Sequence, residues 1–208
     1  MAAVHCCESM QIFLPKQKHN QNIYEREVEN FRKLNRIAKK NSVVLLGSTF
    51  AKDIPVSELV QTFDIDCNVY NRSLTDLSVF DAEKLLDDCV ISLSPKKILL
   101  QLGETDLERG YRTIPEILEA YEKIVAKLKN ANKHCEIIIV SVCEKNAEVY
   151  PEALNVKLEE LAKKHKCQYA DISPAFSNDS PSVKAFSLLK YFMLDRLSFY
   201  DAMNLLNV

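Results

Sequence analysis

The chain has 208 residues, of which 47% are hydrophobic and 27% are charged, and its 27 basic and 29 acidic residues give a formal net charge of −2. This length suits one α/β domain with a full core, so we predict a single domain over residues 1–208 with an N-terminal extension over residues 1–21. The balanced charge, without a basic stripe, excludes a typical nucleic-acid-binding surface, and the apolar runs are too short to cross a membrane.

The seven cysteines are an odd set without the CxxC spacing of metal or redox sites. Three of them fall in or beside apolar runs, where a reduced cysteine behaves as a small hydrophobic residue. Residues 1–15 lack the early basic residues and the long apolar run of a signal peptide. We therefore expect a cytoplasmic protein that uses neither a metal nor another cofactor.

Apolar runs typical of strands alternate with helical patterns along the chain. Asn22 with Glu25 predicts the start of a first helix, and Thr113 with Glu116 forms a capping box before an apolar helical stripe. A further helix is predicted around Leu154. The five strand-like runs are residues 42–47, 67–71, 97–102, 136–142 and 167–172.

The near-continuous apolar character of these runs favours a parallel sheet that is covered on both faces. Five strands joined by crossover helices predict an α/β fold, a flavodoxin-like three-layer α/β/α sandwich with strand order 2-1-3-4-5. In such sheets ligands bind at the carboxyl ends of the strands. The polar residues that follow the first three runs are therefore the candidate site, and they are Gly47, Ser48, Thr49, Asn71, Arg72, Ser73, Gly103, Glu104, Thr105 and Asp106.

This succession of short motifs resembles the SGNH (GDSL-type) hydrolases, which are esterases, lipases and acylhydrolases of the same fold, over residues 22–205. The first motif of that family is G-D-S, and Gly47-Ser48-Thr49 stands in its place. The resemblance implies that Thr49 occupies the position of the catalytic serine and Ser48 that of the aspartate.

The later motifs also match with substitutions. Asn71-Arg72-Ser73 stands for N-R-G and Gly103-Glu104-Thr105-Asp106 for G-x-N-D, so the resemblance puts Ser73 and Thr105 at the oxyanion positions. Asp195 and Ser198 stand for the aspartate and histidine of D-x-x-H. All four residues that name the family are thus replaced.

A hydroxyl is a poor nucleophile at neutral pH without an adjacent base, and losing that base costs a triad enzyme about six orders of magnitude in turnover. Ser198 cannot act as the base. We therefore interpret the chain as a non-catalytic or vestigial member that retains a cleft for a small acyl-, acetyl- or sugar-bearing ligand. The alternatives are an active esterase with Thr49 as nucleophile, and a structural or partner-binding protein; no oligomeric state is indicated.

Other chemistry-bearing residues have plainer interpretations. His134 and His165 precede the fourth and fifth strands, which puts them at the amino ends of the strands, away from Thr49. Cys143 follows the fourth strand without a histidine beside it and is interpreted as a small packing residue. The acidic residues expected near the site are interpreted as solvated loop acids and helix caps rather than as metal ligands, and they are Asp76, Glu104, Asp106, Glu144 and Asp195.

Overall fold

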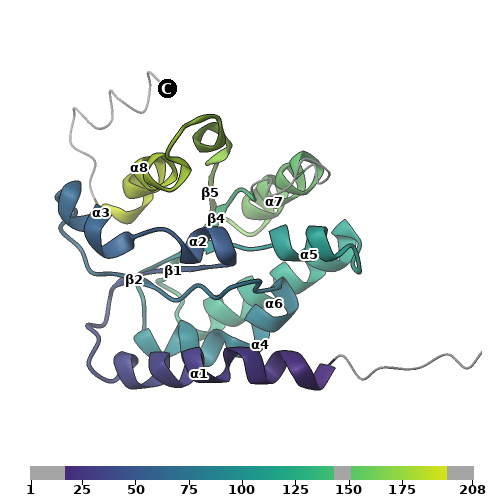
Figure 1. Cartoon of the computed structure of the whole chain (residues 1–208), viewed down its shortest axis with the longest axis horizontal. Helices are drawn as coiled ribbons and strands as arrows, with labels where there is room; N and C mark the ends of the chain where they lie inside the picture. The colour runs from purple at the N-terminus through teal and green to yellow at the C-terminus, as the bar shows by residue number, and fades with distance from the viewer. Residues whose placement is uncertain (1–16, 143–150, 196–208) are drawn as a thin grey trace, which may run out of the picture.

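A computed structural model describes residues 17–142 and 151–195, with side chains from residue 23 onward. Its five strands form one parallel sheet in the order β2-β1-β3-β4-β5 (Figure 1), which confirms the predicted order. The strands are β1 (Val43–Gly47), β2 (Val69–Asn71), β3 (Lys97–Gln101), β4 (Glu136–Val140) and β5 (Gln168–Ala170).

The central strands β1 and β3 pair along their whole length, from Val43 opposite Lys97 to Gly47 opposite Gln101. Every residue of these two strands is buried. Because successive side chains of a strand point to opposite faces, β1 contributes Val44 and Leu46 to one core and Val43 and Leu45 to the other. The continuous apolar sequence of β1 is therefore what a sheet covered on both faces requires.

Helices cover both faces of this sheet (Figure 1). One core contains side chains of α1 (Gln17–Asn35), α4 (Val79–Cys89), α6 (Ile114–Ala131) and α7 (Glu152–Lys164). The opposite core contains side chains of α2 (Thr49–Lys52), α3 (Val56–Thr62) and α8 (Pro181–Met193). The short connecting helices are α5 (Glu104–Arg109), η1 (Ile91–Leu93) and η2 (Ser173–Ser177).

The helix α6 shows how local sequence fixes one of these elements. The predicted capping box is present, since the Thr113 side chain accepts from the Glu116 amide and the Glu116 carboxylate accepts from the Thr113 amide. The buried Tyr121 hydroxyl then donates to the Leu102 carbonyl at 2.7 Å and accepts from the Leu102 amide at 3.0 Å. These two bonds tie the middle of α6 to the carboxyl end of β3.

One helix start and several strand ends differ from the sequence expectation. The first helix begins at Gln17, five residues before the predicted start at Asn22. The strands β2 and β5 each span three residues and are shorter than the apolar runs over residues 67–71 and 167–172. Each of them pairs with its neighbouring strand at three positions. Within the described residues, no helix has the length and apolar character needed to cross a membrane.

The helix α8 runs back toward the amino ends of the strands. It starts after η2 and ends at Met193, and the next carbonyl, that of Leu194, accepts a hydrogen bond of 2.7 Å from the Lys97 ammonium. Lys97 is the first residue of β3. Leu194 and Asp195, which follow α8, therefore lie at the amino ends of the strands, at the opposite end of the sheet from Thr49.

Candidate functional site

The site is built around the exit from β1. Gly47 ends that strand, Ser48 is at the N-cap position of α2 without a side-chain capping bond, and Thr49 is the first residue of the helix. A Cβ atom on Gly47 would lie 2.4 Å from the Ala51 Cβ and 2.6 Å from the Gln101 carbonyl oxygen. Only glycine therefore allows α2 to pack this closely against the ends of β1 and β3.

The Thr49 hydroxyl makes two hydrogen bonds with one residue, Asp76. It donates to the Asp76 carboxylate at 3.0 Å and accepts from the Asp76 amide, also at 3.0 Å. Asp76 has a positive φ of 52°, and its carbonyl accepts from Tyr24 and Arg109. The proton and a lone pair of the Thr49 hydroxyl are thus both committed to a loop that α1 and α5 hold in place.

A buried hydroxyl pair lies beneath this position. The Ser48 and Thr105 oxygens are 2.7 Å apart, and both side chains are almost fully buried. The neighbouring Glu104 carboxylate accepts from the Gln101 amide nitrogen at 2.9 Å and from the Phe50 backbone at 3.3 Å. The structure therefore brings Ser48, Thr105 and Glu104 together at the carboxyl ends of β1 and β3.

The loop after β2 is tied to the same region by Asn71. The Asn71 amide donates to the Ala51 carbonyl at 2.7 Å, while its oxygen accepts from the Ser73 backbone N–H at 3.0 Å. The Ser73 N–H, which stands at an oxyanion position by resemblance, is therefore already bonded within the loop. The buried Ser73 hydroxyl has no hydrogen-bond partner among the described residues.

Arg72 points away from Thr49 and toward α1. Its guanidinium donates twice to the Asn35 side-chain oxygen, at 2.9 and 3.0 Å, and lies 4.9 Å from the Phe31 ring and 5.2 Å from the Tyr70 ring. Burial lowers the pKa of Arg72. These contacts give Arg72 a role in attaching α1 to β2.

Asp106 is a further buried polar residue of this region. Its carboxylate accepts from the Val79 amide at 2.9 Å, at the first residue of α4, and the side chain is only 3% exposed. Burial raises the pKa of Asp106 to about 6, although the bond from Val79 favours the ionised form. A carboxylate at a helix N-terminus is favourably placed, so Asp106 joins α5 to α4.

Asp195 departs from the expected arrangement. Its carboxylate pairs with Lys96 at 2.5 Å and with Lys97 at 3.6 Å, both at the amino end of β3, and the Lys96 contact lowers its pKa. The prediction that Asp195 lies at the carboxyl ends of the strands is therefore wrong, because α8 carries it back across the layer. Ser198, its expected partner, lies outside the described residues, as do Cys143 and Glu144.

The described histidine side chains also lie at the amino ends of the strands. His165 follows α7 and precedes β5, and His134 precedes β4. The chain has no histidine after position 165, so the segment that follows β5 cannot supply an imidazole. Within the described residues, no group of histidine, cysteine and acidic side chains is arranged to hold a metal ion.

Two contacts of the site were not predicted from the sequence, although Asp76 was expected near the site. Asp76 was grouped with the solvated acids, and its bond to Thr49 has no local sequence signal. Phe176 of η2 places its ring 4.8 Å from that of Phe50, which brings the segment after β5 beside Thr49. Only the topological rule that parallel strands share a carboxyl edge could have indicated either contact.

No protein-family model and no curated protein sequence matches this chain. Solved structures do. A Streptococcus pneumoniae protein proposed to be a platelet activating factor superimposes with a TM-score of 0.73 at 17% identity, covering 86% of this chain and 96% of that one. A GDSL-like lipase from Bacteroides thetaiotaomicron gives 0.63 at 15% identity, covering 79% and 93%.

An acetylxylan esterase from Geobacillus stearothermophilus is also similar, with a TM-score of 0.56 at 14% identity, covering 74% of this chain and 92% of that one. At these identities the likeness concerns the fold. The chain therefore has the SGNH/GDSL hydrolase-type fold that the motif order predicts.

Proposed function

We propose that this protein is a vestigial SGNH-type hydrolase whose former catalytic edge now serves to join loops and to bind a small acyl-, acetyl- or sugar-bearing ligand. The observation that supports this most directly is the double engagement of the Thr49 hydroxyl by Asp76. An attacking hydroxyl needs a base that accepts its proton and a free lone pair directed at the substrate. Here the proton is held by the Asp76 carboxylate, and one of the two lone pairs of the hydroxyl oxygen is taken by the Asp76 amide.

The surroundings of Thr49 support the same conclusion. The Ser73 amide that would stabilise an oxyanion is bonded to Asn71, and Thr105 is bonded to Ser48. Losing one oxyanion donor costs about two to three orders of magnitude in rate. A carboxylate such as that of Asp76 is also a weaker base than the imidazole of a triad.

We propose a single domain in the cytoplasm for this function. The four cysteines of the described residues, Cys67, Cys89, Cys135 and Cys167, are free thiols. Free thiols persist in reducing compartments. The Geobacillus neighbour is an acetylxylan esterase, so an acetylated xylooligosaccharide is the first ligand to test for binding.

The test of the proposed function compares the hydrolysis of p-nitrophenyl acetate by the wild-type chain, Thr49→Ala and Thr62→Ala. Thr62 is an exposed threonine of α3 whose hydroxyl bonds within its own helix, so it is a matched control. We expect the same turnover for all three proteins. A loss of tenfold or more in Thr49→Ala alone, with unchanged circular dichroism, would overturn the proposal.

A second candidate function rests on the 3.0 Å distance between the Thr49 hydroxyl and the Asp76 carboxylate. In this candidate the protein is a slow esterase in which Asp76 takes the proton from Thr49. It predicts that Asp76→Asn and Thr49→Ala lower turnover equally and that the double variant loses no more, because the two residues would act as a unit.

A further inference from the structure

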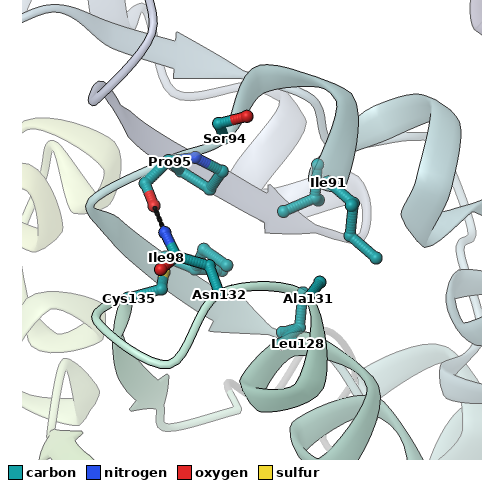
Figure 2. A pocket seen from close by; sticks show the side chains of 9 residues that line it. Ile91, Ser94, Pro95, Ile98, Leu128, Ala131, Asn132 and Cys135 are labelled. Atoms are coloured by element: carbon teal, nitrogen blue, oxygen red, sulfur yellow. Dashed lines mark hydrogen bonds between the residues drawn. The ribbon is translucent and has the colours of Figure 1, made fainter.

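A cavity of about 270 Å³ lies on the α6 side of the sheet near the amino ends of the strands (Figure 2). It is enclosed by the segment after α4, the start of β3, the last turn of α6 and the loop before β4. The residues that line it are Val90, Ile91, Ser94, Pro95, Ile98, Leu128, Ala131, Asn132 and Cys135.

The cavity reaches from the surface into the core. Val90, Ile98 and Leu128 form its inner wall and are at most 2% exposed, and all three belong to the larger core cluster. Ser94 and Ala131 are exposed and mark the rim. A small molecule could therefore enter without the separation of any helix from the sheet.

The side chains of Asn132 and Cys135 in the lining already have partners. The Asn132 amide nitrogen donates to the Pro95 carbonyl at 3.1 Å, as the dashed line in Figure 2 shows, and its oxygen accepts from the His134 amide at 3.0 Å. The Cys135 thiol lies 3.7 Å from the Glu136 carbonyl, and burial raises its pKa to about 12, which keeps it neutral. None of the described lining residues is charged.

These observations define the chemistry of an occupant. A cavity holds ordered water only where two or more polar partners remain free, and apolar cavities stay dry and take up apolar molecules. A charged ligand would lose its hydration without a compensating partner. Since an apolar cavity of about 150 Å³ holds one benzene molecule, this cavity has room for a two-ring molecule of about ten heavy atoms.

We propose that this cavity is a binding site for a small, neutral, apolar molecule of about the size of indole. The site is separate from the proposed ligand cleft. Ile98 is the second residue of β3, whereas Thr49 lies beyond Gly47, which pairs with Gln101 at the other end of that strand. Binding here does not depend on whether the carboxyl edge is catalytic.

Indole itself is a suitable probe because the chain contains no tryptophan. Titration followed by indole fluorescence should show saturable binding with a dissociation constant between about 0.01 and 1 mM. Indole-3-acetate has the same rings and a carboxylate, and it should bind at least tenfold more weakly. Equal binding of the two molecules would overturn the proposal, as would the absence of saturable binding of indole.

The location is tested by filling the cavity from its rim. Ala131→Leu should weaken indole binding at least tenfold, whereas Ala126→Leu, at an exposed position of the same helix outside the lining, should leave it unchanged. Unaltered binding in Ala131→Leu would contradict the assignment.

If Ala131→Leu fails to fold, a measurement on the wild-type chain tests the location of the site instead. Saturating indole should slow the alkylation of Cys135 by N-ethylmaleimide several-fold, as followed by peptide mass spectrometry. Cys167, a half-buried thiol outside the lining, is the internal control and should react at an unchanged rate. Equal effects on both thiols, or no effect on Cys135, would show that indole binds elsewhere.

Discussion

At the carboxyl ends of the strands, Ser48, Thr49 and Thr105 bond to one another or to the neighbouring loops at 2.7 to 3.0 Å. At the amino ends the sheet leaves a cavity on one side and exposed ion pairs on the other. The carboxyl edge is thus closely bonded around β1 and β3, whereas beside the end of β2 an open pocket of about 610 Å³ is lined by Asn71, Arg72 and Ser73. The difference indicates that polar residues at a position where a site is expected can serve as structural links between loops.

The largest effect is expected where an added atom meets the tightly connected edge. Gly47→Ala should lower the free energy of unfolding by about 3 kcal/mol or more, because its Cβ would meet the Gln101 carbonyl, which cannot rotate away. Ala131→Leu at the cavity rim should change it by less than about 1 kcal/mol. Urea denaturation of both variants makes the comparison directly.

The control for backbone effects is Gly110→Ala. Gly110 has a φ of +62°, but a Cβ atom at this position would meet nothing within 4 Å, so the substitution should cost only about 1 to 2 kcal/mol from the left-handed conformation. If Gly47→Ala costs no more than Gly110→Ala, the carboxyl edge is not close-packed and the contrast between the two edges fails.

A second test concerns the charge buried at the carboxyl edge. The pKa of Asp106 is raised to about 6 in the folded protein from its ordinary value of 3.8, so the folded state binds the proton more tightly than the unfolded state does. Stability then falls as the pH rises from about 4 to about 6, and the loss is complete above that range. A shift of this size corresponds to at most about 3 kcal/mol.

Asp106→Asn removes that loss while it keeps an oxygen to accept from Val79. The variant should therefore be more stable than the wild-type chain at pH 8 by up to about 3 kcal/mol, and the gain should disappear below pH 4. Urea denaturation at several pH values measures this. A variant that is less stable at pH 8 would show that the ionised carboxylate stabilises the N-terminus of α4 by more than its burial costs.

The contrast also explains which features the sequence could predict. Runs such as Ile98-Leu99-Leu100 indicate a two-sided parallel strand on their own, and the order of motifs then fixes the positions of Ser48, Thr49 and Thr105 at one edge. The place of Asp195 depends on how far α8 travels back across the sheet, which no residue near Asp195 encodes. The contact between Thr49 and Asp76 joins residues 27 positions apart in sequence, so periodicity could not reveal it.

A smaller effect is expected from the Thr49 hydroxyl itself. Thr49→Val keeps the shape of the side chain but removes both hydrogen bonds to Asp76, and it should cost about 1 kcal/mol in unfolding free energy. Thr49→Ser retains the hydroxyl and should be nearly neutral, without any gain in esterase turnover. If Thr49→Ser is destabilising and Thr49→Val is not, the methyl group rather than the hydroxyl connects α2 to the loop.

The smallest effect is expected at the amino ends of the strands. Asp195 is 62% exposed in its side chain, and of its two partners, Lys96 and Lys97, the latter also contacts the Leu194 carbonyl and Glu136. An exposed ion pair contributes at most about 1 kcal/mol, so Asp195→Asn should cost less than that. Because the pair lowers the pKa of Asp195, this contribution is present above pH ~4 and is lost as the pH falls through the lowered value.

The same variant also separates the two edges functionally: Asp195→Asn should leave any p-nitrophenyl acetate turnover unchanged. If instead it lowered turnover together with Thr49→Ala, Asp195 would act at the carboxyl edge despite its contacts with the start of β3.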